Sequence, residues 1–221
     1  MDQYEALKYY FGHSQFRQGQ EALIDAILSG RDVLGIMPTG GGKSLCYQIP
    51  ALVFDGVTLV ISPLISLMKD QVAALSEAGI QAAYLNSTLT VQQMELVYQR
   101  ARAGAYQLLY VAPERLDTAE FSARISVPLV AVDEAHCISQ WGQDFRPSYL
   151  SIAAFVQRLP RHPVVAAFTA TATGEVQEDI VRRLELREPL RIVTGFDRPN
   201  LFFDVRRPKQ KTPVLLRLIQ E

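Results

Sequence analysis

Short apolar runs alternate with amphipathic segments along the chain. Several of these runs are apolar without alternation, which is typical of strands that are covered on both faces. They lie at 32–37, 56–62, 81–85, 106–112, 128–133, 163–169 and 190–195. The pattern therefore predicts a sheet whose strands are largely buried.

The segments between these runs carry apolar residues at helical spacing. Helices are expected at 17–28, after Ser44, after Pro63, at 91–101 and at 175–184. Thr90 and Gln93 form a capping box at the start of one helix. Repeated alternation of strand and helix predicts an α/β fold with a doubly wound, mostly parallel sheet and helices on both faces. Ligands of such sheets bind beyond the carboxyl ends of the strands, so functional residues are expected to follow strands.

The segment 206–221 departs from this pattern. It starts with a basic, proline-bearing stretch and continues as an apolar helical start from Val214 to Ile219. A length of 221 residues fits one α/β domain better than two. We therefore expect one domain over 1–205, followed by a linker and the start of a second domain that this chain lacks.

Composition excludes some classes of protein. The net charge is −1, so no overall positive field favours nucleic acid and any such site must be local. Cys46 and Cys137 are too few for a disulfide framework or a four-cysteine zinc site, so two buried reduced thiols and no zinc are expected. No signal peptide or apolar stretch of membrane-spanning length is recognisable, and a soluble, cytoplasmic protein with no membrane partner is expected.

A glycine-rich turn follows the first predicted strand. The stretch "MPTGGGKS" (37–44) resembles a phosphate-binding loop, although Met37 stands where the general pattern begins with glycine. Glycines let successive N–H groups point at phosphate oxygens beside a helix N-terminus. The nucleotide-binding candidates are Thr39, Gly40, Gly41, Gly42, Lys43 and Ser44. Lys43 would reach the β- and γ-phosphates, and the Ser44 hydroxyl would hold Mg²⁺. Taken alone, the turn is also compatible with a simple strand-to-helix connection.

Two adjacent acids follow a later apolar strand, in "LVAVDEAH". In a doubly wound sheet this strand end is expected near the glycine-rich loop. Asp133 is expected to hold Mg²⁺, and Glu134 to position and deprotonate an attacking water. The pair could also be an acidic helix cap, but its combination with the loop favours catalysis by Lys43, Asp133 and Glu134.

The residues around these acids resemble a helicase family. The tetrad 133–136 (DEAH) is similar to the motif of superfamily 2 helicases, and "AHCISQWGQDFRPSYL" (135–150) resembles the aromatic-rich loop of the RecQ family of DNA helicases. The family's pattern is also found at 7–20 (motif 0), 60–72 (Ia), 111–116 (Ib), 168–173 (III) and 195–203 (IV). Met37 is a familiar feature of the loop in this family. Gln143 and Ser148 depart from residues common in relatives, at positions away from the phosphate chemistry.

The resemblance implies a RecA-like lobe that binds ATP and Mg²⁺ and acts on single-stranded and partly duplex DNA with 3′ to 5′ movement. It implies that His13 and Arg17 stack on the adenine. The Gln20 amide can bond both N6 and N7 of adenine and is expected to recognise the base. From the residues alone, Arg17 and Gln20 would be ordinary polar residues of a first helical turn.

The aromatic-rich loop is expected to contact DNA. Trp141, Phe145 and Arg146 lie in a polar segment, where exposed rings can stack on bases and a guanidinium can meet phosphate. A single tryptophan is more often core, but the polar surroundings favour exposure. The loop follows Glu134 directly, so DNA bound there is expected to influence the base and His136.

Other strand ends supply further candidates. Ser62 is expected to offer its hydroxyl and N–H to the DNA backbone, and 113–115 to do the same. The hydroxyls of Thr169 and Thr171 are expected to bond side chains of the DEAH motif. The remaining positions are Asp197, Arg198 and Asn200, which look like residues of an interlobe or nucleotide edge.

Three other functions stay open. An RNA helicase of the same superfamily shares the loop and the DEAH motif, but the "QWGQDFR" segment disfavours it. A small-molecule kinase would need a lid and an acceptor pocket, and a non-catalytic binding module would lose Lys43 or Glu134. For a helicase, an arginine from a second lobe is expected to complete the ATP site, so this chain alone is expected to hydrolyse ATP slowly and not to unwind DNA. Such a protein is expected at the bacterial nucleoid or in a nucleus.

Overall fold

A seven-stranded sheet runs through the computed structural model, which describes residues 1–116, 125–142, 144–195, 204–205 and 207–220. Its order is β3-β4-β2-β5-β6-β1-β7, and each described strand pairing is parallel. The strands are β1 (Val33–Ile36), β2 (Thr58–Ile61), β3 (Ala82–Leu85), β4 (Leu108–Val111), β5 (Leu129–Val132), β6 (Val164–Thr169) and β7 (Leu190–Val193). All the predicted strands are confirmed, each slightly shorter than its apolar run.

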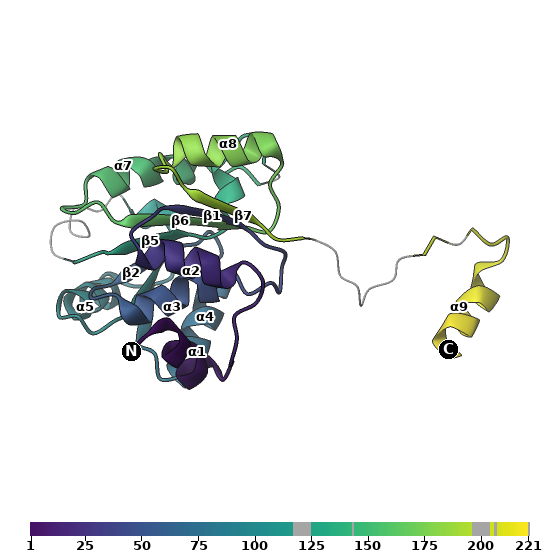
Figure 1. Ribbon diagram of the computed structural model, residues 1–221, viewed down its shortest axis with the longest axis horizontal. Coiled ribbons are helices and arrows are strands. Elements are labelled where there is room, and N and C mark those ends of the chain that lie inside the picture. Colours follow the sequence, from purple (N-terminus) through teal and green to yellow (C-terminus); the bar gives the residue numbers. More distant parts are fainter. Residues whose placement is uncertain (117–124, 143, 196–203, 206, 221) are drawn as a thin grey trace.

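Helices cover both faces of this sheet, as expected. They are α1 (Gln3–Phe11), α2 (Gln20–Leu28), α3 (Leu45–Val53), α4 (Ile65–Glu77), α5 (Val91–Arg102), α7 (Ile152–Gln157), α8 (Gly174–Arg183) and α9 (Lys211–Gln220), with short 3-10 helices η1 (Pro113–Arg115), η2 (Ala135–Ile138) and η3 (Pro147–Ser151). Figure 1 shows α7 and α8 on one side of the sheet and α2, α3 and α4 on the other. The predicted doubly wound α/β fold is confirmed.

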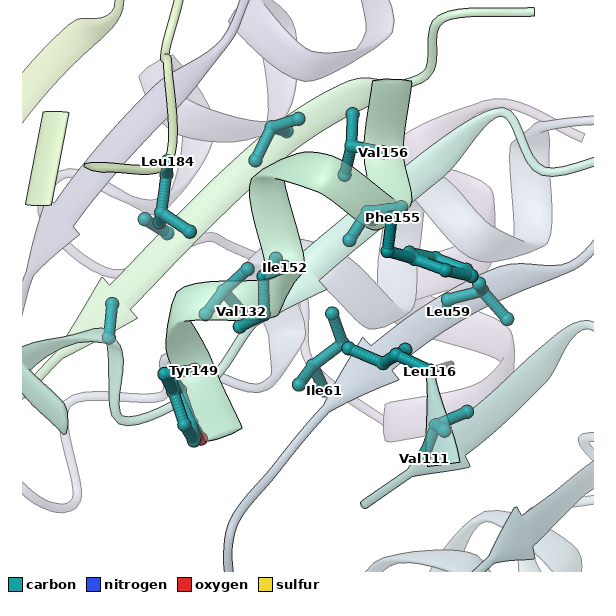
Figure 2. Packing of buried hydrophobic residues seen from close by; sticks show 14 of the residues in the cluster. Leu59, Ile61, Val111, Leu116, Val132, Tyr149, Ile152, Phe155, Val156 and Leu184 are labelled. Atoms are coloured by element: carbon teal, nitrogen blue, oxygen red, sulfur yellow. The ribbon is translucent and has the colours of Figure 1, made fainter. Parts of the chain in front are cut away.

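Burial on both faces explains the apolar strands. All four residues of β1, β2, β4 and β5 are buried. Figure 2 shows one of the two large cores, in which Leu59 of the sheet lies near Phe155 of α7 and Val132 lies near Ile152. A fully buried side chain of this size contributes about 1.5–3 kcal/mol. The buried strands therefore hold the loops at the carboxyl edge of the sheet in fixed positions.

Helix α2 begins later than the periodicity predicts. Gly19 precedes it with φ 82°, in the left-handed region, and a Cβ there would lie 2.8 Å from Cγ2 of Thr194. This glycine turns the chain, so Arg17 precedes the helix instead of lying one helical turn before Gln20. The capping box of α5 is confirmed, with Thr90 N donating to Gln93 Oε1 (2.9 Å) and Gln93 N to Thr90 Oγ1 (3.2 Å).

The last helix stands apart from the sheet (Figure 1). It starts at Lys211, earlier than the predicted Val214, and its Leu215, Leu216 and Ile219 side chains are exposed. An apolar surface of this kind is typical of a segment that packs against something else. The boundary at 205 and the assignment of 206–221 to a second domain stay predictions.

Candidate nucleotide and DNA site

Three neighbouring strands bring the nucleotide motifs together. β6 lies between β1 and β5, so the glycine-rich loop after β1, Thr169 at the end of β6 and the acids after β5 share one edge of the sheet. Met37 N donates to Thr169 O over 3.0 Å, which joins the loop to β6 directly. The strand order therefore places the two acids near the glycine-rich loop, as expected, with β6 between the strands that carry them.

The glycine-rich loop has the backbone of an anion cradle. Gly40 and Gly42 have φ values of 79° and 81°, which residues with a Cβ rarely adopt. Within the described residues, the N–H groups of Gly40, Gly42, Lys43 and Ser44 donate no hydrogen bond to the protein. These donors lie before the N-terminus of α3, the arrangement that binds phosphate.

The first position of the loop is a core position. Met37 is buried, and Cys46 Sγ lies 3.9 Å from its Sδ. A glycine at residue 37 would leave a cavity beside Cys46, which explains why an apolar side chain is accommodated here. Lys43 Nζ donates to Met37 O over 3.2 Å, so the ammonium lies over the loop where phosphates would bind.

Cys46 and Cys137 are free and buried, as expected.

Motif 0 reaches the loop, but in an unexpected way. Arg17 Nη1 donates to Gly40 O (2.6 Å), and Gln20 Nε2 donates to Gly42 O (3.0 Å). Gln20 Oε1 accepts from Arg17 N over 2.7 Å. Both polar ends of the Gln20 amide thus have a partner within the protein, and the side chain, only 1% exposed, presents little surface to adenine in this conformation. His13 is exposed, and stacking of His13 and Arg17 on a base stays a prediction.

The two acids have contrasting surroundings. Asp133 is 7% exposed, and burial, followed by the charge of Glu134, raises its pKa to about 6 despite the opposing effect of the Glu134 N–H and Lys43. Glu134 is partly exposed and has φ 48° and ψ 44°, a left-handed backbone that is uncommon outside glycine. A buried carboxylate with few protein partners suits a cation, and a more accessible one suits an acid–base role.

His136 links the second acid to β6. Its Nδ1 lies 2.8 Å from Thr169 Oγ1 and 3.3 Å from Glu134 Oε2. The expected contact between the Thr169 hydroxyl and a DEAH side chain is therefore present. Thr171 takes part through its backbone instead, since its N donates to Thr169 Oγ1 and its O accepts from it. Within the described part of the chain, the Thr171 hydroxyl that the sequence analysis singled out makes no hydrogen bond to the DEAH motif.

The donor set fits a nucleotide with Mg²⁺. Among the described residues, no group of three or more His, Cys, Asp or Glu side chains could hold a metal ion by itself. Mg²⁺ commonly binds through one or two protein oxygens together with phosphate oxygens and water. The Asp133 carboxylate and Ser44 hydroxyl, beside a cradle of free N–H donors, match that pattern. Metal binding by these two residues stays a prediction.

The aromatic-rich loop presents its tryptophan to solvent. Trp141 is 75% exposed, as its polar surroundings predicted, whereas Phe145 is half-buried. Arg146 is engaged inside the protein: Nε and Nη2 donate to Asp144 Oδ2 (3.1 and 2.8 Å), and Nη1 donates to Pro63 O (3.2 Å). A phosphate at this guanidinium would compete with Asp144 for it. The opposite charge two residues away was a readable signal for this pairing that the sequence analysis missed.

The motif Ia serine is less accessible than expected. Ser62 is buried, its N donates to Val111 O over 3.2 Å, and its Oγ is buried without a described partner. The sheet therefore uses the N–H that was expected to meet DNA. In the 113–115 segment, Pro113 is buried and Glu114 is exposed. Gln143, Asp197, Arg198 and Asn200 lie outside the described residues.

Tyr149 belongs to the site and was not singled out from the sequence. It is fully buried, and its hydroxyl donates to Asp133 O over 2.9 Å. Its signal in the sequence was only its place at the end of the aromatic-rich segment.

In the described parts of the chain, no helix is both long and apolar enough to cross a membrane.

Comparison with known proteins agrees with this geometry. RecQ from Bacillus subtilis, named an ATP-dependent DNA helicase, is 54% identical over 93% of this chain and 35% of its own length. The protein of the same name from Haemophilus influenzae is 49% identical over 96% of this chain and 35% of its own. The chain thus spans about a third of the length of these relatives.

The fold also recurs in solved structures. The DUF1998 helicase MrfA bound to DNA has a TM-score of 0.67 and 16% identity, covering 87% of this chain and 29% of that one. A hypothetical ATP-dependent RNA helicase from Sulfolobus tokodaii has a TM-score of 0.63 and 21% identity, covering 86% and 56%. These likenesses concern the fold alone. The family model for the DEAD/DEAH box helicases matches residues 17–180, most of the described sheet and both nucleotide motifs, so the chain belongs to the DEAD/DEAH box helicase family.

Proposed function

We propose that this chain is the first RecA-like lobe of an ATP-dependent DNA helicase of the RecQ type. The observation that carries the proposal is the continuous contact from the glycine-rich loop through Thr169 and His136 to Glu134. ATP hydrolysis requires a site that binds the phosphates and a base that activates water, and this path connects the two. The similarity to RecQ proteins over most of the chain supports DNA as the nucleic acid.

Each residue has a role in this proposal. The N–H groups of Gly40, Gly42, Lys43 and Ser44 and the Lys43 ammonium bind the phosphates, and Ser44 with Asp133 holds Mg²⁺. When bound, Mg²⁺ supplies positive charge that offsets the charge of the phosphates. Glu134 orients a water and accepts its proton, while His136 fixes the carboxylate of Glu134 relative to β6.

The nucleic-acid side of the proposal rests on the exposed loop. Trp141 offers an exposed ring to an unpaired base, and Arg146 offers a guanidinium to phosphate in competition with Asp144. A second lobe, supplying an arginine to the ATP site, would complete the enzyme. Single-stranded and partly duplex DNA are the proposed partners, and a nucleoid or nuclear location follows from them.

The decisive experiment measures ATP turnover by the full-length helicase. Single-stranded DNA should stimulate hydrolysis, and single-stranded RNA should do so much less. Glu134→Gln should retain nucleotide binding and lose about 100-fold or more in turnover, the lower range for removing a general base. Glu175→Gln, an exposed glutamate on α8, should behave like wild type. Equal stimulation by RNA would favour an RNA helicase, and phosphoryl transfer to a small molecule would indicate a kinase.

A further inference from the structure

One peptide unit at the proposed site is held from both sides. It joins Asp133 to Glu134, the proposed metal ligand and the proposed base. Its carbonyl oxygen accepts from the Tyr149 hydroxyl (2.9 Å, buried), and its N–H donates to Asp133 Oδ1 (3.0 Å). The orientation of this peptide plane therefore sets two things at once, the direction of the Asp133 carboxylate and the start of the Glu134 backbone.

The backbone at this point needs such restraint. Glu134 occupies the left-handed region, with φ 48° and ψ 44°, where a residue with a Cβ is strained. Rotation of the preceding peptide would relieve the strain and would break the hydrogen bond from Glu134 N to Asp133. Strained residues persist where their surroundings hold them, and Tyr149 supplies a side-chain hydrogen bond that opposes this rotation.

Tyr149 is itself firmly placed. Its side chain is fully buried at the margin of the hydrophobic cluster that also contains Val132 and Ile152 (Figure 2). Burial raises the pKa of its hydroxyl well above the usual value, so the group stays protonated and remains a donor. The ring anchors the residue, and the hydroxyl is the part that reaches the catalytic strand end.

The same residue is connected to the DNA-facing loop. Tyr149 N donates to Arg146 O over 3.0 Å, because both belong to the turn that begins η3. The Arg146 side chain holds Pro63 O and Asp144, so a ligand that draws this guanidinium away acts on the start of η3. The Tyr149 side chain then connects that turn directly with the carbonyl oxygen of Asp133.

We propose that Tyr149 is a positioning residue that orients the Asp133–Glu134 peptide through its hydroxyl and passes the position of Arg146 to it. This inference rests on the proposed function, since it concerns the residues that would hold Mg²⁺ and activate water. Because Tyr149 is fully buried, it acts through the carbonyl of Asp133 and not by contact with nucleotide or DNA.

Tyr149→Phe is the direct test, because the ring stays in the core and only the hydroxyl is lost. Tyr110→Phe is the matched control, since Tyr110 is equally buried and its hydroxyl bonds Gln48 and Gln71 rather than the catalytic peptide. In the 221-residue chain without nucleotide, amide hydrogen exchange at Glu134 should become about tenfold faster in Tyr149→Phe, the factor expected from one hydrogen bond. Tyr110→Phe should leave that amide unchanged.

The second measurement is steady-state ATP hydrolysis by the full-length helicase. Tyr149→Phe should lower the DNA-stimulated kcat by about 3- to 10-fold with KM for ATP changed by less than about twofold, the pattern of a group that acts after binding. Unchanged exchange at Glu134, or equal losses in both variants, would overturn the proposal. If wild type itself lacks DNA-stimulated hydrolysis, the proposed function fails, whereas the exchange result still decides the role of the Tyr149 hydroxyl.

Discussion

Gln20 donates its side-chain amide to the carbonyl oxygen of Gly42, across 3.0 Å, and is only 1% exposed. A Cβ on residue 42 would lie 2.3 Å from the same nitrogen, so the glycine and the glutamine are mutually fitted. Motif 0 thus holds the phosphate loop through the Gln20 side chain. Gln20 therefore has two candidate roles, recognition of adenine and positioning of the loop, and an experiment can distinguish them.

The first prediction follows from that contact. Gln20→Ala removes the bond to Gly42 O and the acceptor for Arg17 N, each contributing about 0.5–1.5 kcal/mol. We expect binding of ATP and of GTP to weaken alike, by about tenfold, because the loop contacts phosphate in both. Titration with fluorescent analogues of the two nucleotides measures this, and Gln18→Ala, an exposed neighbour, serves as control. Loss confined to ATP would show instead that the amide recognises the base.

A second prediction concerns the exposed tryptophan. Trp141→Ala should retain ATP binding but reduce stimulation of hydrolysis by single-stranded DNA at least about fivefold, because stacking contributes about 1–3 kcal/mol per base. Tyr9→Ala is a suitable control, since Tyr9 on α1 is 76% exposed compared with 75% for Trp141. The activity of the full-length helicase is measured over a range of DNA concentrations. Stimulation that matches wild type would contradict a DNA contact at Trp141.

Much of the fold was predictable because local patterns are sufficient for it. Non-alternating apolar runs predict buried parallel strands, and the order of motifs along such strands predicts that their carboxyl ends meet. The glycine-rich loop and the DEAH acids were recognisable for the same reason. The geometry that brings Met37, Thr169 and His136 into contact confirms that part of the expectation.

The specific partners of polar side chains were not predictable. Arg146 bonds Pro63 O, 83 positions away in the sequence, and the Gln20 amide bonds the protein's own loop. Residue type gives the donors and acceptors, but which carbonyl they meet depends on packing at distances beyond a helical turn. The later start of α2 has a similar origin, since the left-handed Gly19 lies against β7, with a Cβ there 3.0 Å from Ile192 Cγ2.

A third prediction addresses stability at the opposite edge of the sheet. Asp32, 5% exposed, accepts from Val165 N and Arg187 N through its two carboxylate oxygens, at 2.8 Å each. Asp32→Ala leaves both N–H groups without this acceptor and should lower the free energy of unfolding by about 2–4 kcal/mol. Asp32→Asn keeps one acceptor and should lose about half as much.

Chemical denaturation of the purified chain measures these free energies. Asp70→Ala, an exposed aspartate on α4, is the control and should change the free energy of unfolding by less than about 0.5 kcal/mol. Equal stability of Asp32→Ala and wild type would mean that water replaces the carboxylate without cost.

The last prediction concerns Asp133, whose pKa burial and the charge of Glu134 raise from 3.8 to about 6. Between these two values the folded state binds more protons than the unfolded state, so stability falls as pH rises through this window. Above pH 6 the ionised carboxylate costs the fold about 3 kcal/mol, from a shift of about two units at 1.36 kcal/mol each. Asp133→Asn removes that charge and keeps an acceptor for Glu134 N.

In buffer containing a chelator, we therefore expect Asp133→Asn to be more stable than wild type at pH 7.5. The gain in the free energy of unfolding should fall to about a third of that value at pH 4.5. Urea denaturation at both pH values provides the measurement, and Asp55→Asn, at an exposed site, should show no such trend. A variant less stable than wild type at pH 7.5 would mean that the Asp133 charge is already compensated within the fold. If Asp133 holds Mg²⁺ as proposed, the same substitution should also abolish ATP hydrolysis by the full-length helicase.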